Sequence, residues 1–277
     1  HLLFAGPAGC GKSTLALVTV KELYGETWKQ NFLELNASDD RGIDVVRNTI
    51  KDFARTRPLG NNPFKIIFLD ECDSLTKEAQ QALRRTMENY VASTRFILSC
   101  NFSSKIIDPI QSRCTVFRFK PLKEEEIKNL IKAMTDKEEI TIDEQAIKAL
   151  EEITSGDARR ITNILQSCAS ESKTITRDVI YQTVSAAEPQ EIKEILSLAV
   201  EKNFVQARNL LLETMLKHGL SGLDTIKQIQ KETWNLENLT DEQKINIIDK
   251  IGEIEFRMVE GSDEFLQLES LLAFLAK

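Results

Sequence analysis

The sequence predicts an α/β chain, in which a doubly wound parallel sheet comes first and two helical regions follow. Three observations predict this class. Apolar strand-like runs alternate with helical patterns over residues 1–121, a glycine-rich loop joins the first run to the first helix, and only helical patterns follow Pro121. Strands separated by helices indicate a parallel sheet, because each crossover helix returns the chain to the same end of the sheet.

The glycine-rich loop spans Gly6–Ser13 and reads G-x-x-x-x-G-K-S. The run 2–5 precedes it as a buried strand, and a helical pattern with Leu15, Val18 and Leu23 follows. Glycines let backbone N–H groups turn toward a phosphate, and the helix N-terminus adds a favourable dipole. The loop therefore predicts a nucleotide site in which Lys12 reaches the β- and γ-phosphates and the Ser13 hydroxyl binds Mg²⁺. The residues expected to hold the nucleotide are Gly6, Pro7, Ala8, Gly9, Cys10, Gly11, Lys12 and Ser13, with no role assigned to Thr14.

Four more strands are expected at 32–36, 65–70, 95–100 and 114–119. The run 65–70 is apolar on both faces, which indicates an interior strand of a parallel sheet. Helices are expected over 43–57 and 76–90, the second with Thr76 as its N-cap. Ligands of such sheets bind at the carboxyl ends of the strands, where the glycine-rich loop also lies.

The chain divides into three predicted domains. Residues 1–121 form the nucleotide-binding domain, 122–187 a small helical domain broken at 155–157, and 188–277 an all-helical domain that begins near Glu188-Pro189. No strand-like run is recognisable after Pro121. Helices of the third domain carry apolar positions but no recognisable chemical site, so we expect them to serve assembly.

Charge and cysteine usage narrow the function classes. Residues 1–120 hold 17 Lys and Arg against 13 Asp and Glu, whereas the remainder holds 19 against 30, so a surface for nucleic acid is expected only in the first part. The five cysteines show no C-x-x-C spacing, which disfavours a zinc ribbon and fits a reducing compartment. No apolar run is long enough to span a membrane, and we expect no signal peptide before the first strand.

Carboxylates at the end of the strand 65–70 are placed for metal and water chemistry. Asp70 is expected to hold Mg²⁺, and Glu71 to polarise an attacking water. Asn101 follows the strand 95–100 at the same sheet edge, where an amide could orient that water, although it could equally be a turn residue. A solvated acidic turn is the alternative for Asp70 and Glu71.

Several basic residues are candidates for phosphate contacts. Arg113 precedes the last strand, where it could be an arginine finger for a neighbouring subunit. Arg159 lies in the first turn of a predicted helix, for which Asp157 is a suitable N-cap. Because a cation is unfavourable at a helix N-terminus, Arg159 there suggests that an external anion binds nearby. A stripe on the helix 43–57, opposite a buried face of Ile43, Val46, Ile50 and Phe53, could follow a nucleic-acid backbone or merely be solvated. Its members are Arg47, Lys51 and Arg55, joined by Arg41, Arg84 and Arg85.

These residues together resemble one family, the small subunits of replication factor C, which are AAA+ clamp loaders, in their archaeal form. The resemblance covers nearly the whole chain. It depends on Gly6–Ser13, Leu35–Ile43, Leu69–Glu71, Ala82–Glu88, Ser99–Asn101, Ser112–Cys114 and Gly156–Arg159.

The resemblance implies an ATPase domain, a helical lid and a helical collar that assembles a five-subunit ring. The ring opens a sliding clamp and loads it onto primer–template DNA with ATP and Mg²⁺. By this resemblance Lys12 and Ser13 bind phosphate and Mg²⁺, Glu71 is the base, Asn101 is sensor 1, Arg159 is sensor 2 and Arg113 acts in trans. Arg41, Arg47, Lys51, Arg84 and Arg85 are expected to face DNA. The end of the helix 43–57 and the loop 58–64 are expected to face the clamp.

Two other readings compete with the clamp loader. Residues 70–73 spell the DECD box of a helicase, but that class needs a second α/β domain, which the helical pattern after Pro121 does not offer. A non-catalytic adaptor in an AAA+ ring is opposed by the presence of Lys12, Glu71 and Arg113. The family carries a segment before the first strand, and we expect it to be missing before His1, which affects the adenine contacts. The expected compartment is the cytoplasm of an archaeal cell, or the nucleus if the source is eukaryotic.

Overall fold

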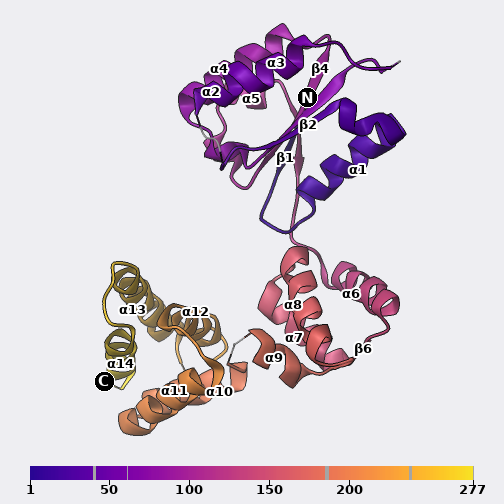
Figure 1. The fold of residues 1–277 in the computed structure, drawn as a ribbon. Helices are drawn as coiled ribbons and strands as arrows, with labels where there is room; N and C mark the ends of the chain where they lie inside the picture. The colour runs from indigo at the N-terminus through magenta and orange to yellow at the C-terminus, as the bar shows by residue number, and fades with distance from the viewer. Residues whose placement is uncertain (40–41, 61, 185–186, 237–238, 277) are drawn as a thin grey trace. The chain divides into compact units, whose positions relative to one another are not determined.

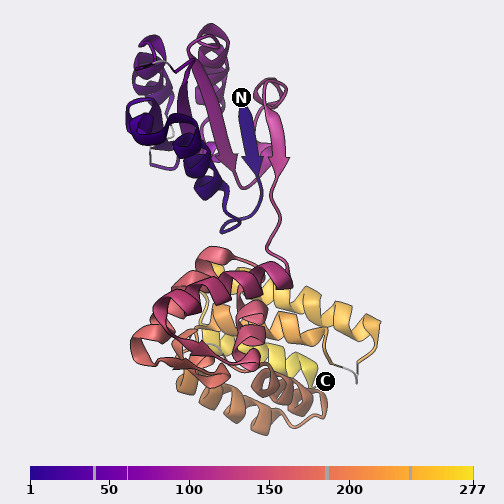
Figure 2. The same cartoon turned by 90° about the vertical axis from the view of Figure 1, so that its right-hand side faces the viewer.

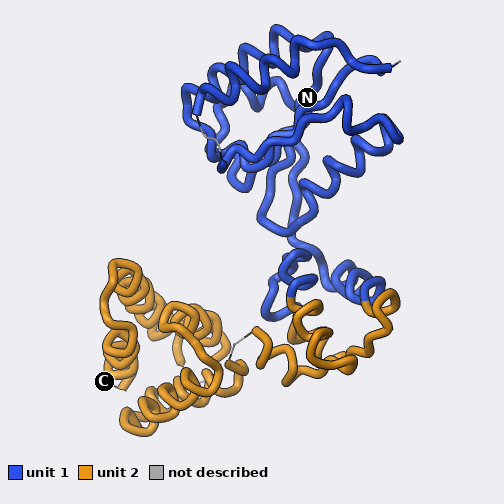
Figure 3. The backbone as a smooth tube through the Cα atoms, viewed as in Figure 1, with its two compact units in different colours: residues 1–134, 151–163 blue, residues 135–150, 164–277 orange. Residues whose placement is uncertain are grey.

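The computed structural model describes residues 1–39, 42–60, 62–184, 187–236 and 239–276. The chain divides into two compact units, residues 1–134 with 151–163 and residues 135–150 with 164–277 (Figure 3). The three predicted domains follow a different division and stay a prediction. Within the described part of the chain, no helix is long and apolar enough to cross a membrane.

The first unit contains a parallel five-stranded sheet in the order β2-β3-β4-β1-β5 (Figures 1 and 2). The strands are β1 (Leu2–Ala5), β2 (Phe32–Asn36), β3 (Lys65–Asp70), β4 (Thr94–Cys100) and β5 (Thr115–Arg118). The predicted parallel sheet is thereby confirmed, with strand ends within one residue of those expected from the sequence. β1 lies between β4 and β5, so the loop that follows β1 leaves from the interior of the sheet.

Helices cover both faces of this sheet. Helix α1 (Lys12–Tyr24) covers one face, where Ala16 and Val20 pack with Phe4 and Phe68. The other face is covered by α2 (Ile43–Val45), the π-helical turn Val46–Ile50, α3 (Lys51–Arg55), α4 (Lys77–Asn89) and α5 (Asp108–Gln111) (Figure 1). Short 3₁₀ turns at Gly25–Gln30, Cys72–Ser74 and Ser103–Lys105 complete the unit. The Thr76 hydroxyl accepts the Ala79 N–H, which confirms the predicted cap of α4.

The apolar residues from which helix α1 was predicted face the solvent and not the sheet. Leu15, Val18 and Leu23 are 43%, 52% and 55% exposed, whereas Ala16 and Val20 are fully buried. The helix begins at Lys12, and its buried face is formed by Ala16, Val20 and Tyr24 and not by Leu15 and Leu23.

The predicted helix 43–57 is interrupted and shorter than expected. A π-helical turn occupies Val46–Ile50, and helix α3 ends at Arg55 because Thr56 is extended. Val46, Ile50 and Ala54 are buried at four-residue intervals, a spacing that the wider π turn brings onto one face. The buried Lys65 side chain donates to the Phe53 carbonyl and to Thr56, and thereby caps the C-terminal end of α3.

Helices dominate the rest of the chain. They are α6 (Glu124–Glu138), α7 (Glu144–Thr154), α8 (Ala158–Glu171), α9 (Arg177–Val184), α10 (Pro189–Val200), α11 (Phe204–His218), α12 (Gly222–Thr233), α13 (Asp241–Val259) and α14 (Glu264–Leu275). α10 to α14 enclose their own apolar core, to which Ile195, Ile226, Ile254 and Leu271 contribute. No second α/β sheet domain occurs among the described residues, so the helicase reading loses the element that it requires.

The expectation that no strand follows Pro121 is wrong in one detail. β6 (Thr141–Ile142) and β7 (Thr174–Ile175) pair in parallel as a two-stranded sheet. Two residues are too few to show the alternation or the apolar run by which strands are recognised in a sequence.

Candidate active site

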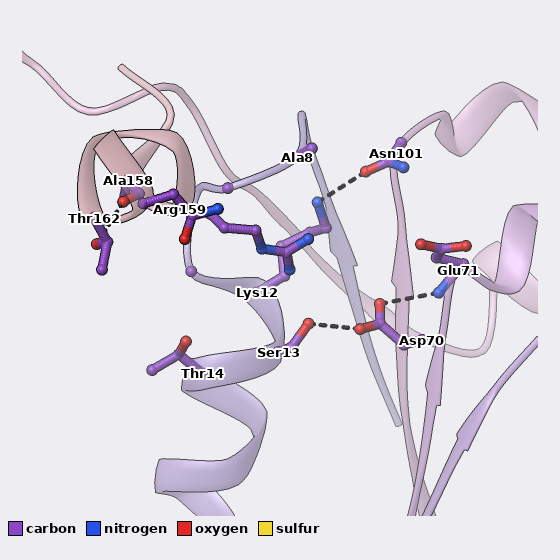
Figure 4. Close-up of a pocket in the computed structure, with 13 residues that line it drawn as sticks. Ala8, Lys12, Ser13, Thr14, Asp70, Glu71, Asn101, Ala158, Arg159 and Thr162 are labelled. Atoms are coloured by element: carbon purple, nitrogen blue, oxygen red, sulfur yellow. Dashed lines mark hydrogen bonds between the residues drawn. The ribbon is translucent and has the colours of Figure 1, made fainter. Parts of the chain in front are cut away.

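The loop between β1 and α1 borders a pocket of about 340 Å³ at the carboxyl ends of β3 and β4 (Figure 4). Its walls come from the loop, from the strand ends and from the first turns of α8. The lining residues are Ala8, Gly9, Gly11, Lys12, Ser13, Thr14, Asp70, Glu71, Asn101, Ala158, Arg159, Thr162 and Asn163. The structure thus brings together five predicted residues from four distant places in the sequence, Lys12, Asp70, Glu71, Asn101 and Arg159.

Lys12 points along the inside of the loop. Its ammonium donates to the carbonyl oxygens of Gly6 and Pro7, both at 2.7 Å, and to Asn101 Oδ1 at 3.0 Å. The residue is only 7% exposed, and these oxygens supply the polar partners that a buried ammonium requires. A phosphate oxygen is a stronger acceptor than a carbonyl oxygen, so Lys12 is placed to exchange the Gly6 and Pro7 carbonyls for a phosphate.

Ser13 and Asp70 meet at the base of the pocket. The Ser13 hydroxyl donates to Asp70 Oδ2 at 2.6 Å, and Asp70 Oδ1 accepts the N–H of Glu71 at 2.9 Å. A hydroxyl beside a carboxylate is the pair of oxygen ligands with which nucleotide sites hold Mg²⁺. No group of three or more His, Cys, Asp and Glu side chains suited to a metal occurs among the described residues, so Ser13 and Asp70 would supply only part of a Mg²⁺ shell beside water and phosphate oxygens.

Glu71 has a left-handed backbone, with φ 51° and ψ 38°. A residue other than glycine seldom adopts this conformation, because it costs conformational free energy. Such strained residues are found mostly at functional positions. The turn directs the chain from β3 into the 3₁₀ turn Cys72–Ser74 while the Glu71 side chain lines the pocket.

Asp73 is a site residue that sequence analysis missed. Its Oδ1 accepts the N–H of Asn101 at 3.4 Å, and its Oδ2 accepts the N–H of Phe102 at 3.2 Å. The carboxylate thereby holds the chain just after β4, where the Asn101 side chain faces Lys12 (Figure 4). The DECD spelling of residues 70–73 was the available signal, but it was read only as a helicase motif.

Helix α8 supplies the wall opposite the strand ends. Arg159 lies in its first turn and extends toward the glycine-rich loop (Figure 4), and Thr162 and Asn163 line the pocket one turn later. Thr14 also lines the pocket, although the sequence offered no role for it. Thr162 and Asn163 were missed because only the spatial meeting of α8 with the loop connects them to the site.

Two buried thiols lie beside the strand ends. The hydrogen bond that the Cys72 thiol donates to Cys100, together with burial, raises the pKa of Cys72 well above its ordinary value, whereas accepting the same hydrogen bond lowers the pKa of Cys100. Both side chains belong to the core between the sheet and helix α4. They act in this core as small apolar groups.

Arg113 lies outside the pocket residues. Its guanidinium forms an ion pair with Glu88 Oε1 at 2.5 Å and donates to the Pro109 carbonyl at 2.6 Å. The side chain is 36% exposed, so a neighbouring molecule can reach it. This position is compatible with action in trans and excludes a contact with the pocket of its own chain in this arrangement.

The basic stripe is solvent-facing where it is described. Arg47, Lys51, Arg55 and Arg85 are exposed, while Arg84 is half-buried. Helix α4, which carries Arg84 and Arg85, packs against α2 and the π-helical turn, which carries Arg47. These arginines of the stripe therefore lie on neighbouring elements. Arg41, the remaining member, lies outside the described residues.

The sheet order and the pocket define a P-loop ATPase of the AAA+ class. The model of the AAA family, "ATPase family associated with various cellular activities", matches residues 2–122, and that of the "Replication factor C C-terminal domain" matches residues 187–274. The chain is similar to the replication factor C small subunit of Methanocella arvoryzae, with 54% identity over 99% of this chain and 84% of the relative. That of Methanococcus maripaludis is 51% identical over 99% of this chain and 86% of the relative.

The chain belongs to the replication factor C small-subunit family. It is therefore an ATP-binding ATPase subunit of a multi-subunit clamp loader, which confirms the fold, family and function predicted from the sequence. Among solved structures, the Thermotoga maritima RuvB Holliday junction branch migration motor aligns with a TM-score of 0.54 and 18% identity, over 73% of this chain and 68% of that one. A likeness at that identity concerns the fold alone.

Proposed function

We propose that the pocket binds ATP with Mg²⁺ and that hydrolysis there drives the loading of a sliding clamp onto primer–template DNA. The observation that carries the proposal is the meeting of Lys12, Ser13, Asp70, Glu71 and Asn101 in one pocket. Each supplies a different chemical function that phosphoryl transfer to water requires. The cytoplasm of an archaeal cell is the proposed compartment, since the relatives named above are archaeal.

The loop and its lysine hold the phosphates in this proposal. Gly9 and Gly11 have left-handed backbones, with φ of 70° and 88°, which let successive N–H groups converge on an anion. Lys12 moves from the Gly6 and Pro7 carbonyls to a phosphate oxygen. Ser13 and Asp70 hold Mg²⁺, which when bound neutralises charge on the phosphates.

The remaining residues act on the attacking water and on the terminal phosphate. Glu71 accepts a proton from the water, and Asn101 orients that water while its Oδ1 stays next to Lys12. Arg159 places its guanidinium toward the terminal phosphate from helix α8. Arg113 leaves Glu88 and completes the pocket of the next subunit, where a guanidinium stabilises the charge of the transition state.

The basic stripe and the collar are the proposed contact surfaces. Arg47, Lys51 and Arg85 bind the phosphate backbone of DNA, and Arg84 and Arg41 are proposed to contribute. The end of α3 and the loop 58–64 face the clamp. Large apolar side chains exposed on α11 to α14 form the contacts between subunits of the ring, namely Val205, Leu216, Ile245, Phe256, Val259, Phe265 and Leu266.

Stepwise assembly tests this function. The ATPase rate of the assembled complex is measured alone, with sliding clamp, and with clamp and primed DNA. The proposal expects the rate to rise at each addition and clamps to appear on the DNA. ATP turnover that ignores both clamp and DNA would contradict it, as would clamp loading that continues in a Glu71→Gln complex over many cycles.

A further inference from the structure

Helix α8 begins in direct contact with the phosphate loop. The N–H of Ala158 donates to the carbonyl oxygen of Gly9 at 3.0 Å, so the first residue of the helix is tied to the middle of the loop. Arg159, Thr162 and Asn163 then line the pocket from the same helix. The position of α8 therefore decides where these three side chains stand relative to a bound nucleotide.

Asp157 sits at this junction with its carboxylate against Gly9. A Cβ placed on Gly9 would lie 1.7 Å from Asp157 Oδ1 and 2.2 Å from its Cγ. Real Cβ contacts are never that short, so no side chain fits at position 9 while the carboxylate occupies this place. Gly9 is thus required twice, by its φ of 70° and by the close approach of Asp157.

The same carboxylate caps helix α8. Asp157 Oδ1 accepts the N–H of Arg160 at 3.0 Å, which satisfies one of the free donors of the first turn. The turn before it is fixed from the other side. Leu122 donates its N–H to the Gly156 carbonyl at 3.1 Å, and a Cβ on Gly156 would lie 2.7 Å from the Leu122 carbonyl oxygen. Asp157 is therefore held between Leu122 and the phosphate loop.

We propose that Asp157 is a positioning residue for the nucleotide: by capping α8 and packing on Gly9, it holds Arg159 at the phosphate end of the pocket. This inference rests on the proposed function of the pocket. Asp157 acts through α8, because it is not among the residues that line the pocket. The sequence suggested a cap here, but neither the contact with Gly9 nor the resulting link between helix and loop.

The proposed role is one of geometry and not of charge. A carboxylate beside a loop that binds a polyphosphate repels that ligand, so the negative charge of Asp157 opposes binding. Asn caps helices about as well as Asp and has almost the same size. Asp157→Asn is therefore expected to keep the function, whereas Asp157→Ala loses both the cap and the contact.

The test measures the affinity of the chain for a fluorescent ATP analogue, together with kcat and KM for ATP in the assembled complex. Asp157→Ala is expected to raise Kd and KM by about tenfold, in line with the loss of a cap. Asp157→Asn is expected to stay within about twofold of the unsubstituted chain in both constants. A matched control is Asp143→Ala, which removes the cap of α7, where Asp143 Oδ1 accepts the Ala146 N–H, far along the chain from the loop.

A double substitution tests the contact itself. Gly9→Ala is expected to weaken binding, because its methyl group meets the Asp157 carboxylate. In Gly9→Ala/Asp157→Ala the carboxylate that the methyl group meets is gone, so the combined loss of affinity should be smaller than the sum of the two single losses. Two independent effects would instead be fully additive in free energy.

The outcomes separate this inference from the proposed function. If the unsubstituted chain fails to bind the analogue, the proposed nucleotide site is wrong. If it binds and Asp157→Ala binds equally well, or the losses of the two single substitutions are fully additive, Asp157 does not position the site through its contact with Gly9. An Asp157→Asn variant as weak as Asp157→Ala would overturn the claim that geometry, and not charge, is what Asp157 supplies.

Discussion

The Nζ atom of Lys12 lies 3.0 Å from Oδ1 of Asn101, although 89 residues separate the two in the sequence. β1 pairs with β4, with Ala5 opposite Cys100, so the loop after β1 and the residue after β4 emerge side by side. The contact therefore follows from the strand order. It places the cation that meets the phosphates next to the amide that orients the water.

Substitution of the loop lysine is expected to abolish turnover. Lys12→Ala removes the ammonium from a pocket in which it is 7% exposed, where its charge is poorly replaced by water. We expect kcat of the assembled complex to fall by at least about 10²–10³. Lys77→Ala, at an exposed position in the first turn of α4, serves as the control and should leave the rate unchanged. Hydrolysis by the Lys12→Ala complex at the original rate would show that the pocket is assigned wrongly.

Asp73 is expected to affect the chemical step more than binding. Its carboxylate holds the N–H groups of Asn101 and Phe102, and it does not line the pocket. Asp73→Ala frees the chain after β4, so Asn101 loses its orientation and kcat should drop by about tenfold or more while the nucleotide Kd changes little.

A double substitution of Asp73 and Asn101 tests whether the two residues act together. If Asp73 acts by orienting Asn101, then Asp73→Ala should have little further effect in an Asn101→Ala background. Glu78→Ala, an exposed acid in the first turn of α4, is the control. Fully additive losses in the double variant would mean that Asp73 works independently of Asn101.

Arg113 is expected to matter only to a neighbouring subunit. Its ion pair with Glu88 is partly exposed, and such pairs contribute about 0–1 kcal/mol, so a phosphate can replace Glu88 at little cost. Arg113→Ala should bind ATP normally yet lower the hydrolysis rate of the assembled complex by about 10³–10⁵. Mixed complexes distinguish the direction of action. Rescue is expected when the adjacent subunit supplies an intact arginine, and rescue within the same subunit would exclude action in trans.

The sequence predicted those parts of the site that depend on local chain geometry. Gly6–Ser13 is a contiguous motif, and Asp70, Glu71 and Asn101 directly follow strands whose carboxyl ends must share one edge of a parallel sheet. Asp73, Thr162 and Asn163 were missed because their roles depend on contacts between segments that only the folded chain brings together.

Local irregularities of the backbone and of the core were also not predicted from the sequence. A π turn such as Val46–Ile50 leaves no clear signature, since its buried positions Val46, Ile50 and Ala54 fit a helical pattern nearly as well. The run 65–70 was predicted to be apolar on both faces, and the burial of its first residue was not anticipated: Lys65 is 2% exposed, and burial lowers the pKa of its ammonium. Its partners Phe53 and Thr56 belong to a helix end whose position the sequence placed two residues too late.

The helices after residue 187 are expected to hold the ring together. Phe256 and Val259 are 64% and 61% exposed on α13 and lie three residues apart, so they share one face of the helix, and contiguous exposed apolar surface marks an interaction site. Phe256→Asp should therefore leave the fold intact but weaken assembly, as measured by light scattering of the mixed subunits. Glu260→Ala, at the end of the same helix, is the control. A chain ending near Ala187 that still assembles would contradict this assignment.

Glu191 anchors a small ionic network at the start of α10. Its Oε1 accepts from Lys217 Nζ at 2.8 Å, while Oε2 lies 2.7 Å from His218 Nε2 and accepts the N–H of Glu188 at 3.0 Å. Partial burial by itself would raise the pKa of Glu191, but Lys217, the Glu188 N–H and His218 together hold that pKa below its ordinary value of 4.5.

The sign of the pKa shift fixes the dependence of stability on pH. Because the folded pKa of Glu191 is lower than the unfolded one, its ionised carboxylate stabilises the fold fully above about pH 5, and this contribution is lost as the pH falls through the folded pKa. Glu191→Gln keeps an acceptor for the Glu188 N–H but removes the charge. Urea unfolding should therefore show the variant to be less stable near pH 7 and equal to the unsubstituted chain in acid. Glu194→Gln, exposed on the same helix, should show no such convergence. A stability difference for Glu191→Gln that stays constant down to about pH 3 would mean that packing, and not the ionised carboxylate, is what the substitution removes.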